Sequence, residues 1–157
     1  MPSRSDLFRL GSELFQKAGV VTVMRGNHYP DDDGLPANAY PLVAWVEGAP
    51  LSQPSRLNPQ GNYAFDIEGR ISCTLWIYTA SVQDARLGDA GWSLMDDLHD
   101  AVLRQFAVYF AGDAASGGNT SNTTVFEPDT FEPFYWYIGK NPIIGAELML
   151  KYRLAFA

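Results

Sequence analysis

Residues 71–79 alternate between apolar and polar side chains, the pattern expected of a β-strand with one buried face. β-branched and aromatic residues dominate this stretch, and it contains no glycine or proline. We therefore predict a strand here. Its buried side would carry Ile71, Cys73, Leu75 and Ile77, and its other side Ser72, Thr74, Trp76 and Tyr78.

Residues 89–111 show the different periodicity of an amphipathic helix. Asp89 is placed to cap this helix and Gly112 to end it. The helix would be roughly 34 Å long, similar to the preceding strand, so we expect each to cover the other along its full extent. The apolar side would hold Trp92, Met95, Leu98, Val102, Phe106 and Tyr109, and the polar side Asp96, Asp97, Asp100 and Arg104.

The remaining segments predict one more helix and four more strands. Residues 5–19 predict a helix capped by Ser5 and ended by Gly19. Stretches rich in proline, glycine and small polar residues predict long loops between the elements. In a subunit of an assembly, a loop as long as residues 48–69 is often an arm that lies on a neighbour. The strands are expected at 20–24, 41–47, 131–138 and 146–156, and the long loops at 26–40, 48–69 and 112–130.

This order, α-β-β-β-α-β-β, predicts an α+β domain. The last two strands are joined by a turn, so we expect a mainly antiparallel sheet with both helices packed on one face. The length of 157 residues suits a single domain that needs no metal or disulfide to hold its core. The predicted core includes Leu75, Ile77, Met95, Leu98, Val102, Phe106, Leu150 and Leu154.

Charge and composition exclude several classes of function. The net charge of −7 argues against binding nucleic acid by charge neutralisation, which requires clustered lysines and arginines. Cys73 is the only cysteine, so we expect a buried, inert thiol. Neither a signal peptide nor a membrane span is expected, because no apolar run approaches the required length.

The sequence holds no recognisable catalytic or metal-binding motif. The two histidines, His28 and His99, have no cysteine or second histidine at ligand spacing. Asp31–Gly34 is reminiscent of a calcium loop, but an EF-hand alignment puts Tyr29 and Tyr40 where carboxylates are needed. We therefore predict no catalytic residue, no metal and no cofactor.

Five segments follow one another in a recognisable order: the N-terminal helix, the strand at 70–78, the loop at 82–86, the helix at 94–102 and the closing segment 141–154. Their order and hydrophobic pattern resemble those of the tail terminator proteins of long-tailed bacteriophages. The resemblance covers most of the chain, while the long segments 48–69 and 112–124 would be departures in length.

The resemblance implies a structural virion protein, assembled in the host cytoplasm. Such subunits form a six-membered ring that caps the head-proximal end of the tail tube and ends tube polymerisation. The expected partners are further copies of the chain, the tail tube protein and the head-side connector or neck proteins. DNA would pass through the ring without specific binding. Carboxylates expected to face the lumen are Asp31, Asp32, Asp33, Glu47, Asp66 and Glu68.

Two alternatives remain open on the sequence. The first is another neck, head-completion or tail-completion protein of the same particle. The second is a small-ligand-binding or enzymatic α+β domain, for which His99, Asp100 and Cys73 would be the first residues to test.

Overall fold

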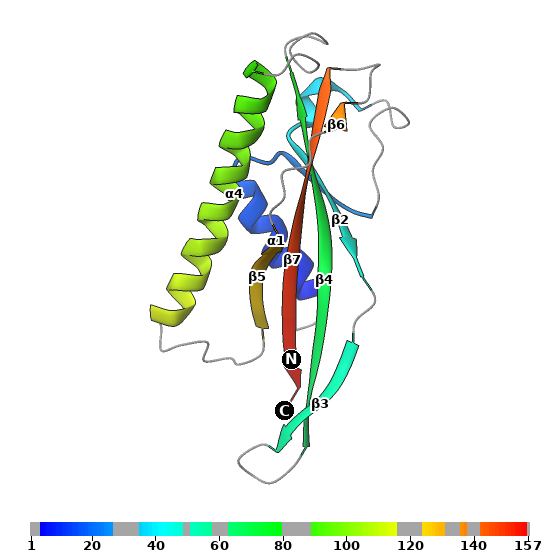
Figure 1. The fold of residues 1–157 in the computed structure, drawn as a ribbon, viewed down its shortest axis with the longest axis vertical. Helices are drawn as coiled ribbons and strands as arrows, with labels where there is room; N and C mark the ends of the chain where they lie inside the picture. Colours follow the sequence, from blue (N-terminus) through cyan, green and yellow to red (C-terminus); the bar gives the residue numbers. More distant parts are fainter. Residues whose placement is uncertain are drawn as a thin grey trace.

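The computed structural model describes residues 4–26, 35–48, 51–57, 63–79, 89–115, 124–130, 136–137 and 142–156. Within these residues the chain forms an α+β domain, which confirms the predicted fold class (Figure 1). The described α-helices are α1 (Arg4–Lys17) and α4 (Asp89–Ala115). The first matches the predicted helix, and the second begins at the predicted Asp89.

The strands build one mixed sheet in the order β1-β2-β4-β7-β5, with β3 paired to β4 and β6 paired to β7. Only β1 and β2 run parallel among the described pairs, so the sheet is mainly antiparallel, as predicted. A short 3-10 helix, η1 (Ala37–Ala39), precedes β2. The strands are β1 (Thr22–Arg25), β2 (Leu42–Glu47), β3 (Leu51–Leu57), β4 (Tyr63–Tyr78), β5 (Thr124–Thr130), β6 (Trp136–Tyr137) and β7 (Ile143–Phe156).

Two of the predicted long loops are wrong. Residues 48–69 contain β3 and the first part of β4, and residues 112–130 contain the end of α4 and the whole of β5. Each missed strand carries a proline, Pro54 or Pro128, next to a shift in register. Proline cannot donate to a ladder, but it is tolerated at edges and bulges. Of the third loop, 26–40, only residues 35–40 and Gly26 are described.

The helix end was also misplaced, because α4 continues past Gly112 to Ala115. A glycine in a helix interior costs only about 1 kcal/mol relative to alanine, which a long helix can tolerate.

β4 is longer than the helix that was expected to cover it. Its 16 residues span roughly 53 Å, whereas the 27 residues of α4 span roughly 40 Å. The prediction that strand and helix match along their full extent is therefore wrong. In Figure 1, β3 and the start of β4 extend below both helices. We call this extension, formed by β3 and residues 63–68 of β4, the arm.

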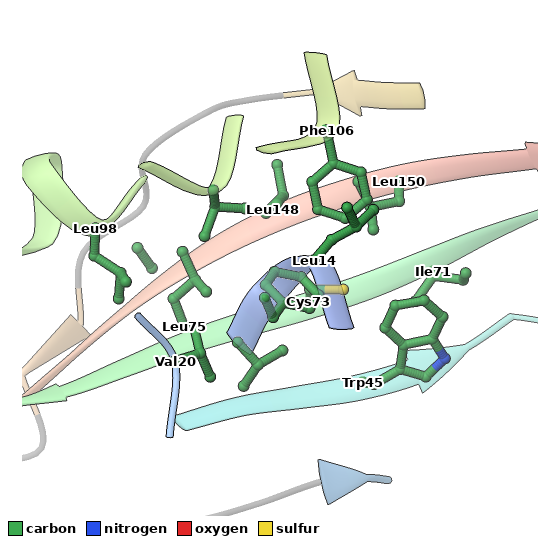
Figure 2. Close-up of a cluster of buried hydrophobic side chains, with 14 of the residues drawn as sticks. Leu14, Val20, Trp45, Ile71, Cys73, Leu75, Leu98, Phe106, Leu148 and Leu150 are labelled. Atoms are coloured by element: carbon green, nitrogen blue, oxygen red, sulfur yellow. The ribbon is translucent and has the colours of Figure 1, made fainter. Parts of the chain in front are cut away.

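The main core lies between the helices and one face of the sheet (Figure 2). From the predicted core, Leu75, Ile77, Met95, Leu98, Val102, Phe106 and Leu150 are all buried, which confirms them. Leu154 lies in β7 beyond the residues whose side chains are described. Phe15 joins the helices to the sheet, because its ring makes edge-to-face contacts with Trp45 at 6.3 Å and with Phe106 at 5.5 Å.

A second, smaller hydrophobic cluster lies on the face of the sheet that the helices do not cover, at one end of that face. Trp76 was predicted on the polar side of its strand, yet it is only 7% exposed. It packs with Tyr40, Leu42 and Ile143, so the segment before β2 covers this end of the sheet.

Two aromatic rings lie on glycines of the neighbouring strand, one on each face of the sheet. Gly145 is the register partner of Trp76, and a Cβ at Gly145 would lie 2.5 Å from Trp76 Cζ3. Gly69 is the partner of Tyr152, and a Cβ there would lie 2.5 Å from the tyrosine Oη. Neither glycine can gain a side chain unless the ring on it moves.

We expect Gly145→Ala to lower the free energy of unfolding by about 1–3 kcal/mol, the usual cost of overpacking a filled site. Urea unfolding of Gly145→Ala, Trp76→Leu and the double variant measures this. Because Leu leaves room for the added methyl group, the double variant should lose less stability than the sum of the two single variants. If the stability losses of the two single variants simply add in the double variant, Trp76 does not pack on Gly145 as described.

Candidate functional site

The residues named for an enzymatic alternative do not form a common site. Cys73 is fully buried in the main core, and burial raises the pKa of its thiol. Asp100 is exposed on the solvent side of α4. In the described part of the chain, no group of three or more His, Cys, Asp or Glu residues is arranged to hold a metal ion. Neither described α-helix contains an apolar stretch long enough to cross a membrane.

His99 is a buried histidine within α4, only 2% exposed. Burial lowers its pKa from 6.5 to about 4, although the nearby carboxylates of Asp100 and Asp96 act in the opposite direction. Its imidazole is therefore neutral at pH 7, and the helix packs around an uncharged ring.

Glu47 is held in a polar cluster where β1, β2 and the start of α1 meet. Its carboxylate lies 2.7 Å from the guanidinium of Arg25 and accepts a hydrogen bond of 3.1 Å from Trp45 Nε1. Arg25 also lies over the ring of Phe8, 5.4 Å from its centroid, and donates a longer hydrogen bond of 3.4 Å to Ser5 Oγ. This cluster joins α1 to the edge of the sheet.

Of the carboxylates expected in a lumen, Glu47 and Glu68 are those whose side chains the structure describes, and these two lie on opposite faces of the sheet. Glu47 lies on the helix-covered face, where it forms an ion pair with Arg25. Gly69 pairs with Tyr152 on the helix-covered face of the sheet. Glu68 is the residue before Gly69, so it lies on the other face of β4. Asp66 is a backbone partner of Gln53 and Ala155, and its side chain is not described. Asp31, Asp32 and Asp33 lie outside the described residues.

Tyr152 brings a polar hydroxyl into the main core on the helix-covered face of the sheet. It is 3% exposed, and its hydroxyl has no hydrogen-bond partner among the described residues. Burial raises the pKa of this hydroxyl, while the positive charge of Arg4 lowers it and Glu47 raises it further. The ring is held by packing on Gly69 and not by polar contacts within the described residues.

The solvent side of α4 is acidic and partly apolar. Asp96, Asp97 and Asp100 are exposed, as predicted. Trp92 was predicted on the buried side but is 47% exposed, and Leu94 is 52% exposed. Trp92 precedes Met95 by about one turn, so the core contacts of the helix begin only at Met95.

No protein-family model and no curated protein sequence matches this chain.

We expect Glu47→Ala to reduce the free energy of unfolding by about 1–3 kcal/mol, because it leaves the buried Trp45 N–H without its acceptor. Glu47→Gln is the matched control, since its amide oxygen can still accept from Trp45. It should lose less stability than Glu47→Ala in the same urea titration. If both variants leave the free energy of unfolding nearly unchanged, the Glu47 carboxylate is solvated and the contact with Trp45 contributes nothing.

His99 should make stability depend on pH. Because its pKa is lower in the folded protein, the unfolded chain binds more protons between pH 6.5 and about 4. The contribution is fully present above pH 6.5 and is lost as the pH falls towards 4. It amounts to on the order of 2–3 kcal/mol. Unfolding titrations at pH 7 and pH 4.5 should show a smaller difference for His99→Gln than for the unchanged protein. If the stability difference between pH 7 and pH 4.5 is the same in both proteins, His99 is not the source of the pH dependence.

Proposed function

We propose that this protein is a structural subunit of a ring that caps the head-proximal end of a phage tail tube and joins it to the head-side connector. The chain has the fold class that the resemblance to tail terminator proteins implies. The observation that carries the proposal is the arm, because a sheet that extends beyond its helices can reach a neighbouring subunit.

The surface chemistry supports the same proposal. Trp92 and Leu94 are exposed apolar side chains on α4. Aromatic residues are enriched at protein interfaces, and the neighbouring acidic residues suit the polar rim of one. The net charge of −7 suits a ring through which DNA slides, since adsorption to DNA grows with the number of cationic contacts. Further copies of the chain, the tail tube protein and the connector proteins would be its partners.

Ring formation and tube capping are the two expected activities. Light scattering and negative-stain microscopy of the purified protein should show closed rings. Added to growing tail tubes, the protein should stop elongation and occupy one tube end. An acidic monomeric protein of similar size serves as the control. A chain that stays monomeric and leaves tube growth unchanged would contradict the proposal, and rings found elsewhere in the neck would indicate a different neck protein.

A further inference from the structure

The arm joins the rest of the domain at the level where the main core ends. Among the described side chains, the core begins at Ile71 in β4 and ends at Tyr152 in β7. Gly69 lies two residues before Ile71 and is the register partner of Tyr152. Beyond this level the sheet continues past both helices (Figure 1). We call Gly48, Gly69 and Tyr152 the arm root.

The backbone pairing along one edge of β4 is interrupted at the arm root. β2 pairs with β4 as far as Glu47, and β3 pairs with it only from Leu51 onwards. Between these two pairings, the described backbone contact is a hydrogen bond of 2.9 Å from the Gly48 N–H to the Arg70 carbonyl. On the other edge of β4, the ladder with β7 runs without a break. The sheet is therefore easier to bend at this level than above it, while β7 keeps the arm attached.

Glycines lie on both sides of this interruption. Gly48 follows the last residue of β2, and Gly69 lies within β4. A glycine weakens a strand, because its backbone has more conformational freedom and it has no side chain to pack. At Gly69 the ring of Tyr152 takes the place of a side chain, since a Cβ there would lie 2.5 Å from the tyrosine Oη. Packing of this ring on Gly69 is thus a contact that holds the arm root closed.

The hydroxyl of Tyr152 makes this contact less favourable than an apolar ring would. The residue is buried, and its hydroxyl has no hydrogen-bond partner among the described residues. A buried polar group without a partner carries the full cost of its desolvation. If the arm bends away from the helices, water can reach the hydroxyl and this cost is recovered. The hydroxyl therefore narrows the free-energy difference between a closed and a bent arm.

We propose that the arm root is a hinge. In the free subunit the arm bends about Gly48 and Gly69 relative to the helix-covered body, while the β4–β7 ladder keeps its register. Hinges of this kind use a few residues that absorb the change in backbone angles. In an assembled ring, contact with the neighbouring subunit would hold the arm at one angle. That last step rests on the proposed ring function, whereas the hinge belongs to the single chain.

Distances between two spin labels measure the arm angle, at a concentration where the chain is monomeric by light scattering. One label is attached to β3 through Gln53→Cys, and the other to the exposed side of α1 through Gln16→Cys. Cys73 is buried and should take up no label, which the chain without added cysteines checks. We expect a broad distance distribution for this pair. The control pair, Gln16→Cys with Ser93→Cys on α4, lies within the body and should give a narrow distribution.

Tyr152→Phe tests the role of the hydroxyl. It keeps the ring on Gly69 and removes the polar group, so the distance distribution between arm and α1 should narrow. The same variant should unfold at a higher urea concentration than the unchanged chain, because the desolvation cost is gone. Tyr78→Phe is the matched control, since its ring is 36% exposed. Neither the distance distribution nor the urea midpoint should change in this control.

The results separate the hinge from the ring function. If the arm pair in the unchanged chain gives a distribution as narrow as the control pair, the arm is rigid and the hinge is wrong. If Tyr152→Phe leaves the distribution as broad as before, or lowers the urea midpoint, the hydroxyl does not loosen the arm root and the proposal is also wrong. Failure to form rings counts only against the ring function, because both measurements use the free subunit. A distribution that stays broad inside assembled rings would overturn the step in which a neighbour holds the arm.

Discussion

The pairing of β4 with β7 is the constraint on which the rest of the structure depends. It runs without a break through fourteen residue pairs, from Phe65 with Phe156 to Tyr78 with Ile143. β2 and β3 pair along one edge of β4, while β5 and β6 pair along the far edge of β7. Because side chains alternate between faces, this single register decides which residues meet the helices and which face outwards.

The register is secured by the two aromatic rings that lie on glycines. Trp76 on Gly145 and Tyr152 on Gly69 occupy opposite faces and lie near opposite ends of the β4–β7 pair. A shift of two residues would preserve the faces, but it would move each ring off its glycine onto a position with a side chain. Alternation thus fixes the faces, and the glycines select one register among those with the correct faces.

The parts that could be predicted are those governed by local periodicity. The buried rows of α4 and β4 follow directly from spacing, because a helix or strand that packs on one core repeats its apolar residues at a constant interval. β3 and β5 escaped prediction because Pro54 and Pro128 are read locally as strand breakers, whereas an edge with an irregular register accepts them. Trp76 is buried by Tyr40, a residue distant in sequence, so alternation alone could not place it in a core.

The candidate site was less accessible to sequence reasoning. The three exposed aspartates of α4 follow from helical spacing. The partner of Glu47 does not, because Arg25 reaches it only through the parallel pairing of β1 with β2. The neighbouring cations Arg70 and Lys151 are likewise brought together only by the β4–β7 register.

The wide sequence separation of β4 and β7 has a consequence for biosynthesis. While the chain emerges from the ribosome, β4 is complete long before β7, with α4 made in between. Until β7 arrives, one edge of the longest strand stays open and the helices lack the part of the core that β7 provides. Such distant contacts form slowly, and an open strand edge favours non-native pairing. The row that pairs Arg70 on β4 with Lys151 on β7 also exists only after β7 has docked.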